Sequence, residues 1–197
     1  MTAKTAKKTT IKPKVVKVAK LPELPKNPFV FEVLDLASKQ RTKAKKVEVL
    51  QKYGDLSLKI ILKWNFDTTI TSALPDGEVP YTGYDEQTTK GGTLSTKISH
   101  EIRKMHESGS FSLGSSDQQG HTTIRRESKH FYRFVKGGDD SMNQIRRETM
   151  FINILEGVHP LEAEIIVLVK DGKLEDRYKV SKDVVATAFP DIVWGDA

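Results

Sequence analysis

Apolar residues along this chain recur mostly at the three- and four-residue intervals of amphipathic helices. In the first half, this spacing predicts helices that begin at Asn27-Pro28, after Thr42 and after Asp55, since each is a residue type that favours a helix start. Gly54 stands where a left-handed C-terminal cap is expected. The third helix has Trp64 on its flank and an inward face formed by Leu58, Ile61, Leu62 and Phe66.

The same spacing predicts helices over 94–107, 123–136, 142–156, 160–169 and 181–189. The inward residues of helix 123–136 are Ile124, Phe131, Phe134 and Val135. Those of helix 142–156 are Met142, Ile145, Thr149, Ile152 and Leu155. Two-residue alternation is scarce, and only residues 173–180 are expected to form a brief strand. The predicted fold class is therefore all-α.

Turn-forming residues divide the predicted helices into two groups. Residues 74–81, Leu-Pro-Asp-Gly-Glu-Val-Pro-Tyr, have turn chemistry, and the polar sequence continues to Thr93. We expect a compact helical bundle built as one body or as two helical units. The expected division is an N-terminal unit 27–74, a linker or loop 75–93, and a C-terminal unit 94–197 with a mobile Ser/Gly loop at 109–120.

The positive charge of the chain is concentrated at its N-terminus. Residues 1–26 contain eight lysines and one acid, Glu23, or +7, which leaves 24 basic and 25 acidic residues, or −1, for the rest. The lysines are Lys4, Lys7, Lys8, Lys12, Lys14, Lys17, Lys20 and Lys26. With three prolines and no aromatic residue, this segment buries too little surface to offset the entropy of ordering. It is predicted to be a disordered basic arm.

Few residues of the sequence indicate a catalytic or metal-binding site. The absence of cysteine excludes disulfides, thiolate metal sites and a cysteine nucleophile. The five histidines lack the spacing that places two metal ligands on one helical face, and His159 before Pro160 is expected to cap a helix. The acidic pairs Asp139-Asp140 and Glu162/Glu164 stand at helix starts, where the helix dipole favours acids. We expect no metal, no cofactor and no enzymatic activity.

One basic pattern lies on the predicted helix 123–136. Arg125, Lys129 and Arg133 are four residues apart and form a stripe. Arg126 lies beside this stripe, and Lys136 continues it. Such a face suits phosphate contact. The competing interpretation is a solvated helix side whose cations are favoured by the helix C-terminus. Arg146 and Arg147 follow after a turn short enough to bring the two basic segments together.

Seven segments together resemble a known group of proteins: 26–34, 42–51, 72–81, 131–138, 146–156, 159–164 and 188–191. They are similar to an uncharacterised family of small helical proteins from tailed bacteriophages, including myoviruses of cyanobacteria. The resemblance covers residues 26–194. The arm and the loop 109–120 look like additions or variable regions, so a role shared by the family is not expected to depend on them. The resemblance implies phage origin and a location in the host cytoplasm or the virion, and it brings no catalytic residues.

These observations favour a non-enzymatic phage accessory protein. Its helical body is expected to dock on a phage or host protein, while its arm binds nucleic acid non-specifically or an acidic protein surface. The alternative is a virion component, such as a capsid, neck or internal head protein, and an enzyme of unknown class is a third. With no secretory leader and no apolar run longer than Ile165–Val169, we expect an intracellular protein that does not enter membranes.

Overall fold

A computed structural model describes residues 23–77 and 122–195. Within these stretches the secondary structure is helical, with one isolated bridge between Ser72 and Val135 and no strand. The predicted all-α class is confirmed. The predicted helix 94–107, the loop 109–120 and the seven lysines from Lys4 to Lys20 lie outside the described residues.

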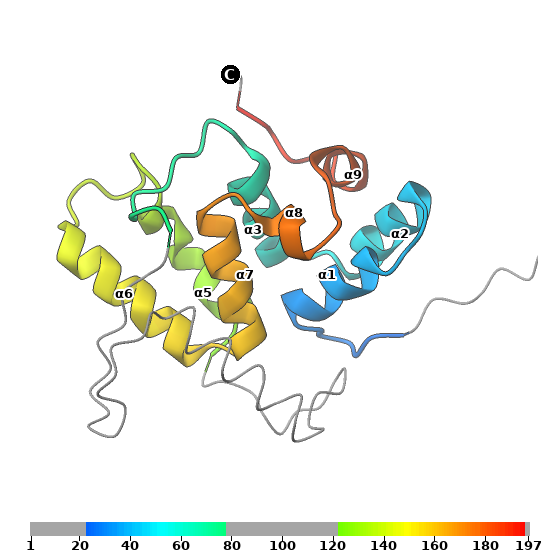
Figure 1. The fold of residues 1–197 in the computed structure, drawn as a ribbon, viewed down its shortest axis with the longest axis horizontal. Coiled ribbons are helices and arrows are strands. Elements are labelled where there is room, and N and C mark those ends of the chain that lie inside the picture. Colours follow the sequence, from blue (N-terminus) through cyan, green and yellow to red (C-terminus); the bar gives the residue numbers. More distant parts are fainter. Residues whose placement is uncertain (1–22, 78–121, 196–197) are drawn as a thin grey trace, which may run out of the picture.

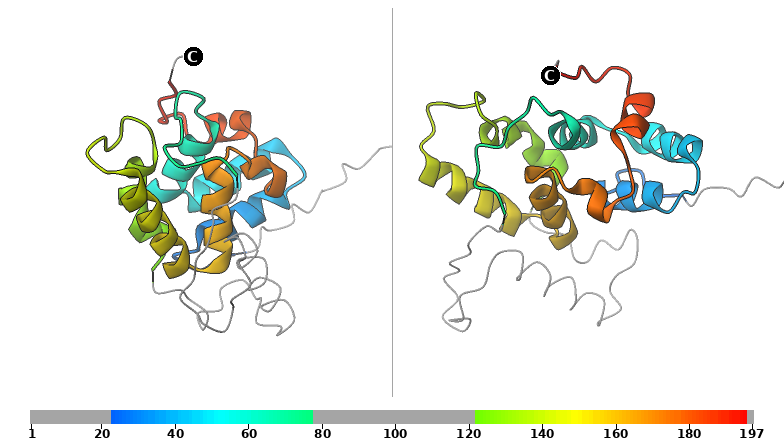
Figure 2. Two further views of the ribbon diagram at one scale, coloured as in Figure 1. Left: turned by 60° about the vertical axis from the view of Figure 1, so that its left-hand side comes forward. Right: turned by 45° about the horizontal axis from the view of Figure 1, so that its top comes forward.

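The described helices follow one another along the chain, and Figure 1 labels the α-helices. They are α1 (Val30–Ser38), α2 (Lys43–Tyr53), α3 (Leu56–Phe66), α5 (Ile124–Glu127), the 3-10 helix η2 (Ser128–Phe134), α6 (Gln144–Gly157), α7 (Pro160–Lys170), α8 (Leu174–Arg177) and α9 (Lys182–Ala188). Helix α6 lies at one end of the long axis, and α1 and α2 lie at the other (Figures 1 and 2).

Two predicted capping residues and one predicted proline start their helices. The Thr42 hydroxyl accepts a hydrogen bond from the Lys45 amide at 3.4 Å, and the Asp55 carboxylate accepts one from the Leu58 amide at 2.9 Å. Pro160 occupies the first turn of α7, where its missing N–H costs no hydrogen bond. These local signals explain why α2, α3 and α7 begin where the sequence predicts.

The first helix begins later than predicted. Its N-cap is Phe29 and its first residue is Val30, so the predicted start at Asn27-Pro28 is wrong. The Glu32 carboxylate inside the helix accepts a hydrogen bond from the Phe29 amide at 2.9 Å. An acid within the first turn, rather than Asn27, therefore satisfies this free amide.

Gly54 ends α2 for a reason other than the one predicted. Its φ of −67° lies outside the left-handed region, so the expected left-handed cap is absent. A Cβ atom at this position would collide with the backbone carbonyl oxygen of Leu50 in α2 and would lie 2.5 Å from Cζ of Phe189, just beyond α9. Glycine is needed here because both a local carbonyl group and an aromatic ring approach the backbone closely.

Helix α6 turns a different face inward from the one predicted. Ile145 is 79% exposed and Thr149 is exposed, whereas Phe151, Ile154 and Leu155 are buried. The helix carries two overlapping apolar stripes. The stripe that contains Phe151 and Leu155 packs against α7 and η2. The predicted face is therefore wrong at Ile145 and Thr149, whereas Ile152 is half-buried and Leu155 is buried as predicted.

The predicted strand at 173–180 is also wrong. Residues Leu174–Arg177 form the single helical turn α8, and Leu174 and Tyr178, four residues apart, are both buried. The side-chain oxygen of Asn65 accepts a hydrogen bond from the Leu174 amide at 3.1 Å. A cap supplied by α3 therefore converts a short alternating segment into a helical turn.

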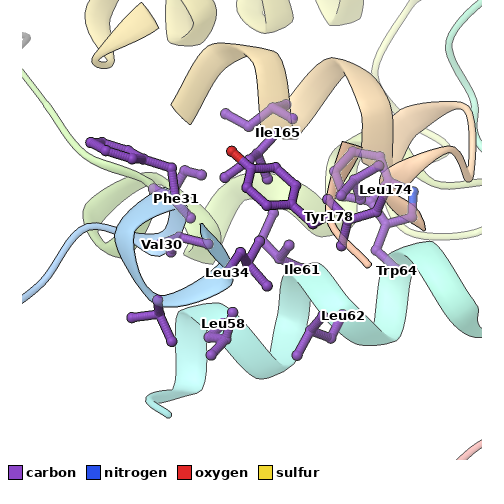
Figure 3. Close-up of a cluster of buried hydrophobic side chains, with 14 of the residues drawn as sticks. Val30, Phe31, Leu34, Leu58, Ile61, Leu62, Trp64, Ile165, Leu174 and Tyr178 are labelled. Atoms are coloured by element: carbon purple, nitrogen blue, oxygen red, sulfur yellow. The ribbon is translucent and has the colours of Figure 1, made fainter. Parts of the chain in front are cut away.

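Helices from both sides of the predicted linker share one hydrophobic core. Helix α1 packs on α2, which also contacts α9, whereas α3 packs on α7 and α5. Figure 3 shows Tyr178 among side chains of α1, α3 and α7, with Leu34, Ile61 and Ile165 around its ring. Residues far apart in the sequence therefore pack together around α3 and α7.

Trp64 belongs to the core rather than to the flank of α3. Only 6% of its surface is exposed. Its ring centroid lies 5.7 Å from that of Phe131 and 6.4 Å from that of Phe134, both on η2. The predicted flank position is wrong because η2 covers this side of α3.

Candidate nucleic-acid interface

The described part of the chain begins just before the end of the predicted basic arm. We call residues 24–28 the arm root. The Leu24 amide donates a hydrogen bond to the Tyr53 hydroxyl at 3.1 Å, and the Arg125 guanidinium donates one to the Pro28 carbonyl at 3.3 Å. Leu24 also packs against the core, and Pro28 is buried. The arm root is thus fixed between α2 and α5, and Lys26 within it is exposed.

The predicted basic stripe does not follow a single α-helix. The chain forms α5 for only four residues and then continues as the 3-10 helix η2. With three residues per turn, positions four apart point about 120° away from each other. Lys129 and Arg133 therefore do not share one face of η2, while Phe131 and Phe134, three apart, are both buried as predicted.

Two of the five cations predicted to bind phosphate pair with carboxylates. The Arg125 Nε lies 2.6 Å from the Asp55 carboxylate, and the Arg133 Nε lies 3.5 Å from that of Asp139. Arg133 also donates a hydrogen bond to the Tyr132 hydroxyl at 3.0 Å. These contacts hold both guanidinium groups against the body and compensate their charge.

The other three predicted cations are exposed. Arg126, Lys129 and Lys136 form no side-chain hydrogen bond or ion pair with residues 23–77 or 122–195. The same holds for Arg146, at the start of α6. The phosphate-binding role of these residues stays a prediction, but their positive charge is accessible.

The turn between η2 and α6 brings the two basic segments together, as predicted. The Arg147 guanidinium donates hydrogen bonds to the backbone carbonyls of Arg133, Asp139 and Met142, at 2.8, 2.7 and 3.2 Å. At the start of the turn, just after η2, Gly137 adopts a left-handed conformation with a φ of +77°. Arg147 therefore positions the turn, because its donors are directed to the backbone.

Sequence reasoning treated Glu162 as an ordinary acid at a helix start and missed its main role. Its carboxylate is buried and accepts hydrogen bonds from two other helix starts, the Ile124 amide of α5 at 2.9 Å and the Val30 amide of α1 at 3.4 Å. Burial raises the pKa of Glu162 to about 7, although the two amide hydrogen bonds favour the charged form. One side chain thus joins the starts of α1, α5 and α7.

His159 is the N-cap of α7, three residues before Glu162. Its Nδ1 accepts a hydrogen bond from the Leu161 amide at 3.2 Å, which confirms the predicted capping role. The imidazole is also packed on Phe31, at a centroid distance of 4.9 Å, and on Phe29 at 5.6 Å. Burial lowers the pKa of His159 to about 4, so the ring is neutral at physiological pH.

A cavity of about 630 Å³ lies between the segment 67–77 and the C-terminal end of α7. At its wall, the buried Lys170 ammonium donates hydrogen bonds to the Pro75 carbonyl at 2.8 Å and the Gly77 carbonyl at 3.1 Å, and it pairs with Asp171. Three acceptors satisfy this cation. Lys170 therefore fastens the loop at 75–77 to α7, and the cavity contains no unpaired buried group that indicates a ligand.

Metal binding and membrane insertion depend on particular groupings of residues. Among the histidines and acids of 23–77 and 122–195, no three come together in an arrangement that would hold a metal ion. The same ranges contain no helix with the length and hydrophobicity needed to cross a bilayer.

Comparison with known proteins identifies a family. Neither the curated proteins nor the solved structures contain a match to this chain. A family model matches residues 33–118 and 113–176, described as a family of unknown function, DUF6433. The two matched segments overlap at residues 113–118, and the arm lies outside both. Because the match covers well over half of the sequence, the chain belongs to this family of unknown function.

Proposed function

We propose that this protein is a non-enzymatic accessory protein that binds nucleic acid through its basic arm, while its helical body docks on a protein partner. The observation that carries the proposal is the separation of charge, +7 in residues 1–26 against −1 in the remainder. Lysine side chains contact phosphates rather than base edges, so the binding is independent of sequence.

The contacts of the body support this division of roles. Several of its cations are paired within the fold: Arg125 with Asp55, Lys63 with Asp67, Lys43 with Asp183 and Lys59 with Asp191. In each pair a carboxylate compensates the positive charge locally, although the net charge of the body is unchanged. A near-neutral body leaves the arm as the main source of electrostatic attraction to a polyanion.

The biological setting that we propose is infection by a tailed bacteriophage, with the protein in the host cytoplasm. This part of the proposal depends on the resemblance of the seven sequence segments given above. A virion component, in the capsid, neck or internal head, is the alternative. Mass spectrometry of purified particles separates the two, because a virion component is present in stoichiometric amount and an accessory protein is not.

The binding proposal is tested by removing the arm without disturbing the arm root. Deletion of residues 1–22 removes seven lysines and keeps Leu24, which packs on the core. The full chain, with eight lysines in the arm, should bind a DNA duplex with a log–log salt slope of up to about −7, and the truncated chain should bind far more weakly. A full-length variant with the seven lysines changed to glutamine controls for arm length and should match the truncation.

Salt-independent or undetectable binding by the full chain, to DNA and to RNA, would refute the nucleic-acid proposal. The arm would then be assigned to an acidic protein surface. Both altered chains should keep the melting midpoint of the full chain, because both keep all the core residues of 23–77 and 122–195.

A further inference from the structure

The arm root fixes the point at which the basic arm is attached to the body. Its two anchors are the hydrogen bonds from the Leu24 amide to Tyr53 and from Arg125 to the Pro28 carbonyl. Just beyond Pro28, the Val30 amide is bound by Glu162, which also binds the first amide of α5. The arm therefore starts beside the C-terminal end of α2 and the first turn of α5.

Exposed cations stand next to both anchors. The Lys52 ammonium lies 5.0 Å from the centre of the Tyr53 ring, and more than a third of the residue is exposed. Arg126 follows Arg125 in the first turn of α5 and is exposed, with no carboxylate partner in the described ranges. Lys26 is exposed within the arm root itself.

Two further exposed cations flank the segment that connects η2 to α6. Lys136 follows η2, and Arg146 lies in the first turn of α6. The start of α6 is at the end of the long axis opposite to residues 23–29 (Figures 1 and 2). A phosphate backbone that follows the arm onto the body meets Lys52 and Arg126 before it can reach this end.

We infer that Lys26, Lys52 and Arg126 form a phosphate-binding surface that continues the basic arm onto the body, and that Lys136 and Arg146 lie outside it. The inference rests on the proposed binding of nucleic acid by the arm. Arg125 is a positioning residue in this surface, because its guanidinium is held by Asp55 and by the arm root. Duplex DNA carries one charge per about 1.7 Å, so neighbouring phosphates are available to cations around the root.

The test compares two charge-matched double variants of the full chain. Lys52→Glu with Arg126→Glu changes the surface beside the arm root, and Lys136→Glu with Arg146→Glu changes the distant end. Both lower the net charge by the same amount, so a difference between them reports position. The first variant should reduce the salt slope on a short DNA duplex by about two units, and the second should leave the slope unchanged.

Equal loss of slope in the two variants, or a greater loss in the second, would overturn the inference and leave binding by the arm intact. Absence of salt-dependent binding by the unmodified chain would refute the proposed function instead. If a glutamate variant loses its helical circular dichroism, the same two residues in each pair are changed to glutamine instead. Each glutamine substitution changes the net charge by half as much.

Chemical footprinting tests the same surface without a substitution. Lysine acetylation of the unmodified chain, mapped by mass spectrometry with and without bound DNA, should show protection of Lys26 and Lys52. Lys136 should react equally in both samples. Protection of Lys136 to the same degree as Lys52 would contradict the inference.

Discussion

Glu162 offers the sharpest test of how the helices are held together, because its carboxylate links α1 and α5 from within α7. Glu162→Gln keeps the shape of the side chain and one acceptor oxygen but removes the titration. Glu162 is 1% exposed, and Arg125 and Glu32 are the charged groups that act on it most directly. The amide of glutamine resembles the protonated carboxyl group, so any cost of its altered hydrogen bonds is independent of pH.

The sign of the pH effect follows from the raised pKa. Burial raises the pKa of Glu162 from 4.5 to about 7, so the folded state holds this proton more tightly than the unfolded state. The resulting stability is fully present below pH 4.5 and is lost as the pH rises through 7. The corresponding free energy is about 3 kcal/mol. Relative to the natural chain, Glu162→Gln should therefore gain about this much stability between pH 4.5 and pH 8.

His159 has the opposite effect over nearly the same range. Burial lowers its pKa from 6.5 to about 4, so its contribution is present above pH 6.5 and is lost as the pH falls through 4. In the natural chain the two contributions oppose each other between about pH 4.5 and 6.5. His159→Asn supplies a non-titrating N-cap and should become relatively more stable as the pH falls, by about 3 kcal/mol.

Urea denaturation monitored by circular dichroism at several pH values measures both effects. The informative quantity is the free energy of unfolding of each variant minus that of the natural chain, because the other acids titrate equally in both. The double variant, Glu162→Gln with His159→Asn, should show little pH dependence in this difference, because the two single effects have opposite signs over nearly the same pH range. A difference curve for Glu162→Gln that is flat from pH 4.5 to pH 8 would refute the assignment of a buried, proton-binding carboxyl group.

Three further substitutions test packing, each by its urea midpoint at neutral pH. Gly54→Ala places a Cβ atom against the Phe189 ring and should cost about 1–3 kcal/mol. Leu155→Ala should cost about 2–5 kcal/mol because the side chain is buried, whereas the exposed Ile145→Ala on the same helix should stay within about 0.5 kcal/mol. Lys170→Met leaves two loop carbonyls without their buried donor and should cost about 2–3 kcal/mol.

The parts of the fold that the sequence predicts well are those controlled by neighbouring residues. Asp55 and Pro160 start their helices through contacts within a single turn, and Gly172, with a φ of +66°, follows the end of α7. The predictions that fail depend on distant partners. Asn65 of α3 caps the helical turn that begins at Leu174, and Phe189, far along the chain, joins the local Leu50 carbonyl in excluding a side chain at Gly54.

The choice between two apolar faces is a further limit of periodicity. On α6, Ile145 and Ile152 fit helical spacing as well as Phe151 and Leu155 do. Only the position of α7 and η2 decides that the second pair packs inward and leaves Ile145 exposed. Spacing identifies the helix correctly, but it does not determine which stripe meets the core when a helix carries two.

The same limit applies to charge, and here it changes the candidate interface. The spacing of Arg125, Lys129 and Arg133 predicts a stripe because an α-helix aligns residues four apart, but η2 has a tighter turn that separates the last two. Nor does the sequence reveal that Asp55, seventy residues away, pairs with Arg125. Once paired cations are set aside, accessible charge beside the arm root includes Lys52, on a helix that the basic pattern did not include. A phosphate-binding surface is therefore determined by which cations the fold leaves unpaired and where the arm begins, and both are properties of the tertiary structure.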